Sequence, residues 1–477
     1  MTRGRLVVHA HFYQPFRVDP FSGRIPHDAS AAPYRNWNER ITAECYQPIA
    51  ELGIPEGISW NLGATLTAYL AAEAPTVLAA FAEADRHGGG TGMAQSFHHT
   101  ILPLAAVHDR RTEVLWGLRD FEFRFGRRAT AMWLPETATD LATLRVMAEA
   151  GVRSTVLAPW QADAQHVDPR RPYRVDVGDG HHITVMFYDG ELSGTVSFEP
   201  SATADADRFA RERVAPRLAD SLPDGADPTL VIATDGELYG HHQSFRDLFL
   251  QRLVAPGAGS GRSFDVVGLA SVVEEHDEHP HPEMRIRERT SWSCHHGVLR
   301  WTGECPDVPD GRWKGPLRAA LERLAGGIDT ATDALARGLP GLADVWEARN
   351  RYVDVVIGAS TGDEFAAACL GGRAGADDRA RLLALMEAQR WRLAMFASCG
   401  WFWDDPARQE THAVLRAAAR AARIIDGLAA TGLESRLVAD LATLRSPSLG
   451  IDGREIYRQA LAEVGQPPPH AVPARVR

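Results

Sequence analysis

The chain has 477 residues, of which 45% are hydrophobic and 24% charged, and its formal net charge is −11. This composition excludes a disordered or fibrous protein and predicts a large buried core, organised as one large domain with a smaller companion. The acidic balance comes without any lysine- or arginine-rich run, which argues against nucleic acid as the main ligand and favours a neutral substrate.

The N-terminus and the cysteines indicate a cytoplasmic protein. The basic residues 1–5 precede an apolar stretch that His9 and His11 interrupt, so the stretch is too short for a signal peptide. No segment has the length and apolarity to span a membrane. The cysteines number five at irregular spacings without a CxxC pair, which suggests neither a disulfide framework nor a zinc finger. We predict no cofactor and leave the oligomeric state open.

From residue 4 to about residue 235 the sequence repeats one rhythm: a short apolar, β-branched run, a polar or aromatic signal, and a longer helical stretch. Strands that alternate with helices predict a parallel sheet with right-handed crossovers. The seven runs cover residues 5–8, 57–60, 91–94, 129–133, 154–158, 183–187 and 229–233.

A polar or aromatic side chain follows each run. A closed parallel barrel brings all the strand ends to one face, whereas an open sheet uses only the strands near a switch point. The sequence therefore predicts an α/β fold with a seven-stranded (β/α)7 barrel. In chain order the side chains at the strand ends are His11, Asn61, Gln95, Glu136, Trp160 with Gln161, Asp189 and Asp235.

The composition changes after the barrel region. We predict the catalytic barrel over residues 1–265, a connector with cleft loops over residues 266–313, and an α-helical C-terminal domain over residues 314–477. Alanine, leucine, arginine and glutamate dominate that last part, with apolar residues at helical spacing.

Glu136 is the first candidate catalytic residue. It follows Pro135, and because proline cannot continue a strand ladder, its carboxylate is expected at the strand end, facing the barrel mouth. That is where a nucleophile belongs. The alternative is a first-turn glutamate that the helix dipole stabilises, and a Pro-Glu-Thr sequence alone favours this alternative.

Asp235 and Glu237 follow the most apolar run of the chain, with Gly236 between them. Two acids at i and i+2 of a strand point the same way, and a raised pKa would allow one to donate a proton while Glu136 stays ionised. Retaining glycoside chemistry needs the two catalytic carboxyls roughly 5–5.5 Å apart. Metal binding or loop capping is the alternative.

Histidines are frequent near the predicted strand ends, at positions 9, 11, 98, 99, 241 and 242. Neutral imidazoles beside carboxylates can hydrogen-bond sugar hydroxyls, or several could bind zinc with Asp235 or Asp189. For any single histidine, a structural hydrogen bond is the simpler explanation. Many of the twelve tryptophans lie beside polar residues, where flat rings could stack on sugars, although core packing explains any single one.

Three segments carry a family resemblance: His-Ala-His-Phe-Tyr-Gln-Pro (residues 9–15), Trp-Leu-Pro-Glu-Thr (133–137) and Asp-Gly-Glu-Leu-Tyr-Gly-His-His (235–242). Together they resemble the signature regions of glycoside hydrolase family 57. The resemblance implies a distorted seven-stranded barrel followed by a helical domain, and a retaining mechanism on α-glucans. It also implies that Glu136 is the nucleophile and Asp235 the acid/base.

Two departures and one further likeness accompany this resemblance. Tyr13 stands where the family usually has a histidine before Gln-Pro, and Gln95 stands where several members have glutamate. The stretches around Cys294 and Cys399 resemble a bacterial subgroup whose helical domain has no assigned function.

We therefore predict a retaining enzyme of the amylase, 4-α-glucanotransferase or branching type, with an α-glucan or α-linked oligosaccharide as substrate. The alternatives are a metal-dependent barrel hydrolase of the deacetylase or α-mannosidase type, and an inactive carbohydrate-binding protein. The predicted substrate-binding residues are His11, Gln14, Trp60, Gln95, His99, Trp133, Trp160, Asp189, Glu237, Tyr239, His241, Trp292, His296, Trp301, Trp401, Trp403 and Asp404.

Overall fold

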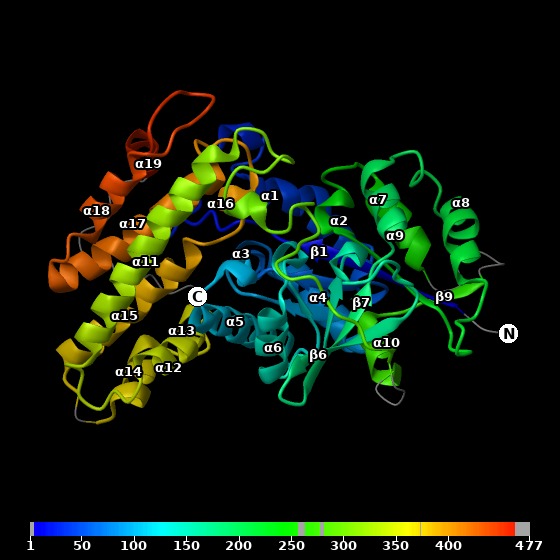
Figure 1. The fold of residues 1–477 in the computed structure, drawn as a ribbon, viewed down its shortest axis with the longest axis horizontal. Coiled ribbons are helices and arrows are strands. Elements are labelled where there is room, and N and C mark those ends of the chain that lie inside the picture. The colour runs from blue at the N-terminus through cyan, green and yellow to red at the C-terminus, as the bar shows by residue number, and fades with distance from the viewer. Residues whose placement is uncertain (1–3, 256–262, 277–280, 373, 463–477) are drawn as a thin grey trace. The chain divides into compact units, whose positions relative to one another are not determined.

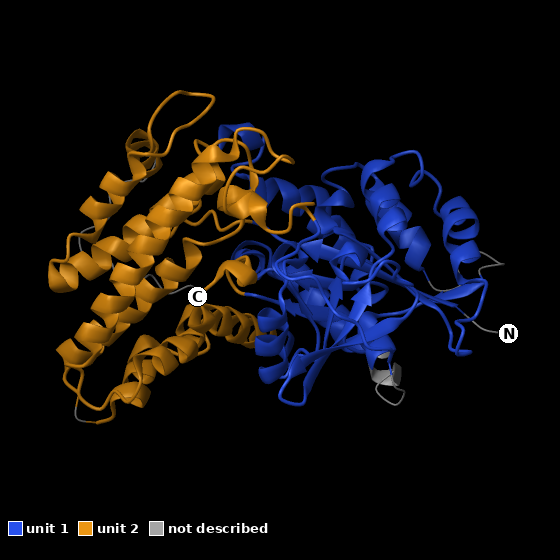
Figure 2. Cartoon of the chain, viewed as in Figure 1, with its two compact units in different colours: residues 1–14, 27–96, 124–292 blue, residues 15–26, 97–123, 293–477 orange. Residues whose placement is uncertain are grey.

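A computed structural model describes residues 4–255, 263–276, 281–372 and 374–462. The chain forms two compact units, each assembled from separate segments (Figure 2). We call residues 1–14, 27–96 and 124–292 the sheet unit, and residues 15–26, 97–123 and 293–477 the helical unit. Segments 15–26 and 97–123 lie inside the range predicted for the barrel, yet they cluster with the C-terminal helices.

The sheet unit carries the strands, with helices packed around them (Figure 1). The strands are β1 (Gly4–Phe12), β2 (Ser59–Leu62), β3 (Gly92–Gln95), β4 (Met132–Trp133), β5 (Ser154–Leu157), β6 (Pro172–Gly178), β7 (His181–Phe187), β8 (Thr229–Asp235) and β9 (Phe264–Val266). The helices are α1 (Trp37–Ile41), α2 (Gln47–Glu51), α3 (Ala64–Glu73), α4 (Pro75–His87), α6 (Leu141–Glu149), α7 (Gly190–Phe198), α8 (Ala206–Phe209), α9 (Arg246–Val254) and α10 (Leu269–His276).

Each of the seven predicted runs contains or overlaps one of the parallel strands, so the predicted α/β fold is confirmed. One sheet has the order β4-β3-β2-β1-β8 with β9 beside β1, and a second has the order β5-β7-β6. The strand β6 pairs antiparallel with β7 and was not predicted.

Two contacts join these sheets into a ring. A parallel bridge links Ala131 to Ser154, and the Asp189 N–H donates to the Val231 carbonyl at 2.8 Å. The cyclic order β1-β2-β3-β4-β5-β7-β8 is compatible with a distorted seven-stranded barrel. The buried side chains packed together between these strands include Val7, Met93, Trp133, Val156, Met186 and Val231.

The helical unit contains α5 (Val107–Phe125, except its last two residues), α11 (Lys314–Ala336), α12 (Val345–Arg351), α13 (Val353–Val356), α14 (Gly362–Leu370), α15 (Ala376–Ala394), α16 (Cys399–Phe402), α17 (Gln409–Ala429), α18 (Leu433–Leu441) and α19 (Gly453–Ala462). The predicted helical C-terminal region is thus confirmed.

Buried ion pairs explain why α5 belongs to the helical unit. Asp109 of α5 lies 2.8 Å from Arg349 and also pairs with Arg392 of α15, which in turn pairs with Asp329 at 2.7 Å. All but Asp329 are at most 5% exposed. The Trp116 indole N–H of α5 donates to the Arg349 carbonyl at 3.0 Å. These contacts hold α5 against helices that lie more than 200 positions later in the chain.

Removal of Asp109 should destabilise the helical unit strongly. In Asp109→Ala the guanidinium groups of Arg349 and Arg392 lose a shared buried carboxylate, and a broken buried pair costs about 3–5 kcal/mol. Urea unfolding followed by circular dichroism measures this loss. Asp363→Ala, at an exposed aspartate in the first turn of α14, is the control and should change stability by less than about 0.5 kcal/mol. Equal effects of the two substitutions would contradict the stabilising role of the network.

Candidate functional site

The backbone at the end of β4 is strained. Glu136 has φ 57° and Thr137 has φ 46°, a left-handed conformation that two consecutive residues other than glycine rarely adopt. Such residues cost of order 1–3 kcal/mol each and occur where surrounding contacts enforce them, often at active sites. Here the buried Gln161 accepts a 2.8 Å hydrogen bond from the Thr137 hydroxyl and donates another, also 2.8 Å, to the Thr137 carbonyl.

Trp292 holds the Glu136 carboxylate. Its indole N–H donates to Glu136 Oε2 at 3.1 Å, and its backbone N–H donates to the Glu136 carbonyl at 3.0 Å. The Trp292 ring lies edge-on to Trp133 at 5.1 Å and to Tyr188 at 6.4 Å between centroids. A strained backbone and an anchored side chain together fix the direction of this carboxylate.

Two acidic side chains, Asp235 and Glu237, lie at the end of β8. Asp235 is the β8 partner of His11 on β1, in parallel register. Gly236 is required beside it, because a Cβ at that position would come within 2.2 Å of the Phe12 ring. Glu237, which is 7% exposed, accepts hydrogen bonds from the Tyr46 hydroxyl at 2.5 Å and from the Tyr13 backbone N–H at 3.1 Å.

The pKa values of this pair are raised. Asp235 is exposed to solvent, but the protein packed around its carboxyl partly desolvates it, and this effect, with the charges of Glu237 and Glu136, raises its pKa to about 8. Burial raises the pKa of Glu237 to about 7, against the hydrogen bonds it accepts from Tyr46 and Tyr13. Asp235 is therefore mostly protonated at neutral pH, and Glu136 lies close enough to influence it electrostatically.

Two neutral histidines, His9 and His11, lie on the adjoining strand β1. Burial lowers the pKa of His9 to about 3 and that of His11 to about 4, so both rings are uncharged at neutral pH. Trp133 stacks on them with centroid distances of 4.5 Å to His9 and 5.2 Å to His11. The side-chain oxygen of Asn61 lies 3.1 Å from a ring nitrogen of His9 and 3.2 Å from a ring nitrogen of His11. The Asn61 amide nitrogen donates a hydrogen bond to Gln95 Oε1 at 2.5 Å.

Some predicted substrate-binding residues join this cluster. His11, Gln95, Trp133, Glu237 and Trp292 contact its other members, and Gln14 donates to the Tyr46 hydroxyl at 2.9 Å. Trp133 is completely buried, so its ring faces are covered by protein.

Other predicted residues of the sheet unit have different surroundings. Trp60 lies in the core against Phe81 and Phe125. Tyr239 is buried and accepts from Thr234 at 3.1 Å, while His241 lies 2.5 Å from Glu44. Asp189 caps α7 through the Leu192 N–H and pairs with Arg217 at 3.2 Å. The side chain of Trp160, in contrast, is 41% exposed to solvent.

The remaining predicted residues belong to the helical unit. His99 has φ 58° and its Nδ1 lies 2.6 Å from the Ser398 hydroxyl. Trp301 and Trp401 are completely buried, and Arg318 lies over the Trp401 ring at 4.9 Å. Trp403 is 42% exposed with Arg408 over its ring at 4.3 Å, and the Asp404 carbonyl accepts from Trp313 at 3.0 Å. His296 lies beside two cysteines and an aspartate.

Tyr46, Asn61 and His9 also line the cluster, although none was among the predicted site residues. Asn61 and His9 each directly follow a predicted apolar run, so the sequence marked their positions as strand ends. Tyr46 ends a π-helical turn (Thr42–Tyr46) within the connection from β1 to β2, a place that no sequence pattern marked.

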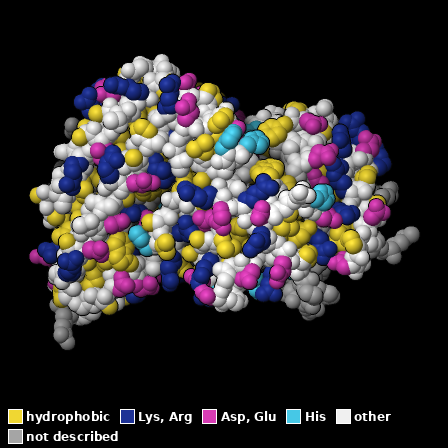
Figure 3. Space-filling model, viewed as in Figure 1, with side chains coloured by type: hydrophobic (Ala, Val, Ile, Leu, Met, Phe, Trp, Pro, Cys, Tyr) yellow, Lys and Arg dark blue, Asp and Glu magenta, His cyan; other side chains and the backbone are white. Residues whose placement is uncertain are grey.

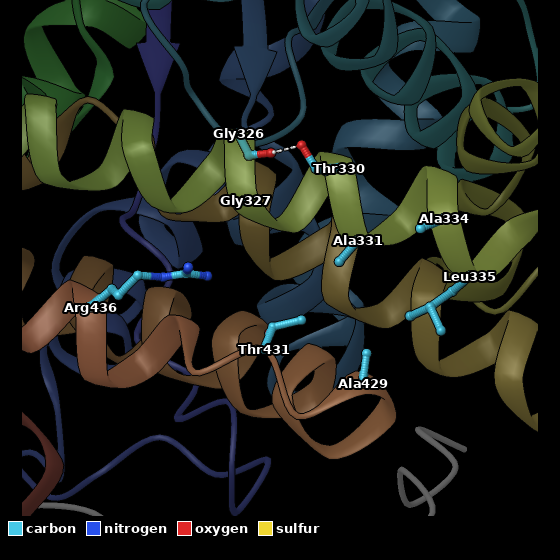
Figure 4. Close-up of a pocket in the computed structure, with 9 residues that line it drawn as sticks. All are labelled: Gly326, Gly327, Thr330, Ala331, Ala334, Leu335, Ala429, Thr431 and Arg436. Atoms are coloured by element: carbon cyan, nitrogen blue, oxygen red, sulfur yellow. Dashed lines mark hydrogen bonds between the residues drawn. The ribbon is translucent and has the colours of Figure 1, made fainter.

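A pocket of the helical unit has an uncharged lining apart from one arginine. The pocket in Figure 4 is lined by Gly326, Gly327, Thr330, Ala331, Ala334, Leu335, Ala429, Thr431 and Arg436. Arg436 is the single charged member of that lining, and Thr330 donates to the Gly326 carbonyl at 2.8 Å. On the face drawn in Figure 3, acidic and basic side chains are interspersed. Among the helices described, none has the length and apolarity needed to cross a bilayer.

Comparison with known proteins identifies two families along the chain. Residues 22–286 match the model of glycosyl hydrolase family 57, and residues 310–466 match a domain of unknown function, DUF3536. A search of curated protein sequences finds no match.

Solved structures share the fold at low sequence identity. An exo-type maltose-forming amylase from Pyrococcus sp. ST04 aligns with a TM-score of 0.73 and 15% identity over 96% of this chain and 88% of that chain. A branching enzyme from Thermococcus kodakaraensis has a TM-score of 0.61 and 14% identity over 96% of this chain and 94% of that chain. A 4-α-glucanotransferase from Thermococcus litoralis has a TM-score of 0.56 and 14% identity over 87% of this chain and 60% of that chain.

Proposed function

We propose that this chain, which belongs to glycosyl hydrolase family 57, acts on α-glucans or α-linked oligosaccharides with retention, through a glycosyl intermediate on Glu136. One observation carries the proposal. Glu136 and Asp235 stand at the ends of strands of the same ring, and the charge of Glu136 helps to keep Asp235 protonated. Retaining glycoside chemistry requires a carboxylate and a protonated carboxyl near each other, and the electrostatic influence of Glu136 on Asp235 supports these roles.

The first chemical step uses both residues. Asp235 donates its proton to the glycosidic oxygen while Glu136 attacks the anomeric carbon, which breaks the C–O bond and forms a covalent glycosyl ester. The Trp292 indole N–H, already bound to Glu136 Oε2, orients the attacking carboxylate. Loss of the leaving group leaves Asp235 ionised.

In the second step Asp235 acts as a base. It takes a proton from water or from a sugar hydroxyl, and that oxygen displaces Glu136 from the anomeric carbon. Water gives hydrolysis and a sugar acceptor gives transfer. The neutral His11 is proposed to hydrogen-bond sugar hydroxyls together with Gln95 and Glu237, and the exposed Trp160 ring is proposed to stack on a sugar face.

The alternative of a metal-dependent hydrolase lacks a ligand set at this place. Among the residues that the structure describes, the histidines of β1 form no group of three or more metal-binding side chains. A cytoplasmic location and the absence of a nucleic-acid partner stay part of the proposal, together with the α-glucan substrate.

The test of the proposed function is incubation of the full chain with amylose, maltooligosaccharides and other α-linked oligosaccharides, with chromatography of the products. Shorter chains that keep the α configuration at early times support hydrolysis with retention, and redistributed or branched chains support transfer. Initial products of inverted configuration would contradict the proposal.

The pH profile should report the protonation of Asp235. Because its pKa is raised to about 8 and the acid form is the reactive one, kcat/KM should fall as pH rises through about 8. Glu237→Gln removes a negative charge that helps to raise this pKa, so the alkaline limb should move to lower pH. Glu56→Gln, at an exposed glutamate in the same unit, should leave the limb in place. A limb that moves to higher pH in Glu237→Gln would contradict the assignment.

A further inference from the structure

Four potential metal ligands meet in the helical unit, on a segment that the proposed function does not use. Cys294, His296, Cys305 and Asp307 place one ligand atom each within 4.8 Å of all the others, and both cysteines are buried free thiols. They come from two tight turns. The Gly297 N–H donates to the Cys294 carbonyl at 3.2 Å, and the Val308 N–H donates to the Cys305 carbonyl at 2.9 Å. Each turn thus presents ligands at positions i and i+2.

The distances between the ligand atoms fit a tetrahedral ion. Zinc bonds of about 2.3 Å to sulfur and about 2.0–2.2 Å to nitrogen and oxygen imply ligand-to-ligand separations of about 3.3–3.8 Å. The Cys294 and Cys305 sulfurs are 3.4 Å apart, and Cys305 Sγ is 3.6 Å from His296 Nδ1. His296 Nδ1 is 3.5 Å from Asp307 Oδ2. These three separations all lie within the tetrahedral range.

A backbone contact orients the carboxylate ligand. The His295 N–H donates to Asp307 Oδ2 at 2.9 Å, which fixes the side chain in the direction of His296. Metal-binding carboxylates commonly have such an outer partner.

A buried cation stands beside the two thiols. The Lys314 side chain is fully buried, and its Nζ has no hydrogen-bond partner among the described residues. Its electrostatic neighbours are Arg300, Cys305, Cys294 and Asp404. Two thiolates, one carboxylate and a neutral imidazole around a zinc ion leave one negative charge. The Lys314 ammonium would balance this negative charge. Beside two neutral thiols without zinc, the buried ammonium would have no compensating charge from the cysteines.

We propose that Cys294, His296, Cys305 and Asp307 bind one zinc ion in a structural site. Four protein ligands leave no open position, which distinguishes this site from a catalytic centre, and the mixed sulfur, nitrogen and oxygen set favours zinc over magnesium or calcium. The ion ties the turn at residues 294–297 to the turn at residues 305–308.

The test measures zinc by plasma mass spectrometry in untagged full-length protein, loaded with zinc chloride and desalted. The wild type should hold about one zinc per chain, and Cys294→Ser with Cys305→Ser should hold less than about a tenth of that. Cys369→Ser removes a free cysteine outside the cluster and should keep the metal.

A second pair of variants decides the question if the cysteine variant fails to fold. His296 and His166 are both exposed histidines, so neither substitution opens a buried cavity. His296→Ala should weaken zinc affinity about tenfold or more in chelator competition, and His166→Ala, at an exposed histidine outside the cluster, should leave it unchanged. Asp307→Asn should weaken it as His296→Ala does.

Three results would overturn the proposal. The first is a wild type that holds less than about a tenth of a zinc per chain after loading. The second is equal zinc affinities of His296→Ala and His166→Ala. The third is a Cys294–Cys305 disulfide found by mass spectrometry in protein purified under reducing conditions. Because these readouts do not depend on turnover, they stand or fall separately from the proposed glycosidase activity.

Discussion

Glu136→Gln should lower turnover of every substrate by about 10⁴-fold or more while the protein stays folded and still binds sugar. The amide keeps the shape of the carboxylate but cannot form the glycosyl ester. Its oxygen can still accept the Trp292 indole hydrogen bond, so the strained turn at residues 136–137 keeps its anchor. Initial rates on α-glucans and circular dichroism measure the two halves of this prediction.

A nucleophile has a further signature, which separates it from a residue needed only for structure. Glu136→Ala supplied with azide and α-glucosyl fluoride should form the β-glucosyl azide, because azide replaces the missing carboxylate and a single displacement inverts the centre. Glu56→Gln should keep wild-type rates. Near wild-type turnover by Glu136→Gln, or an α-azide from Glu136→Ala, would show that another residue is the nucleophile.

Asp235→Asn should slow cleavage of α-glucans by about 10²–10⁴-fold, since the leaving oxygen then departs without a proton. The effect should depend on the leaving group. With α-glucosyl fluoride the first step needs no acid, so the glycosyl ester on Glu136 should accumulate as a burst of fluoride release.

The configuration of the product formed with azide tests the role of Asp235 further. It should speed release from Asp235→Asn and give the α-glucosyl azide, because two displacements restore the configuration. Asp227→Asn, at an exposed aspartate just before β8, should behave as wild type. Asp235 is not the acid/base if Asp235→Asn loses as much rate on α-glucosyl fluoride as on α-glucans and shows no burst of fluoride release.

The strands were predictable because their sequence signal is strong and local. Buried parallel strands are continuous apolar runs, as at residues 229–233, and all seven runs contain or overlap a strand. The closure of the ring was harder, since it depends on single contacts such as the one between Asp189 and Val231. The placement of residues 97–123 was not predictable, because it rests on pairs like Asp109 with Arg349, 240 positions apart.

The candidate site divides in the same way. Glu136 and Asp235 were singled out because each ends a strand, although each alone resembles a cap or a loop acid. Tyr46 was missed because it reaches Glu237 from a turn of π-helix, where no periodicity marks a site residue. Cys294 and Cys305 lack the CxxC spacing of common zinc sites, so only the folding of two turns brings their sulfurs together.

The central claim is that Glu136 carries the glycosyl group. A fluorinated α-glucosyl substrate that slows the second step, followed by proteolysis and mass spectrometry, tests it most directly. The account predicts a stable adduct of one sugar per chain, located on the peptide that contains Glu136 and absent from Glu136→Gln. An adduct on another carboxylate, or full turnover of the wild type with no adduct under conditions that trap other retaining enzymes, would contradict it.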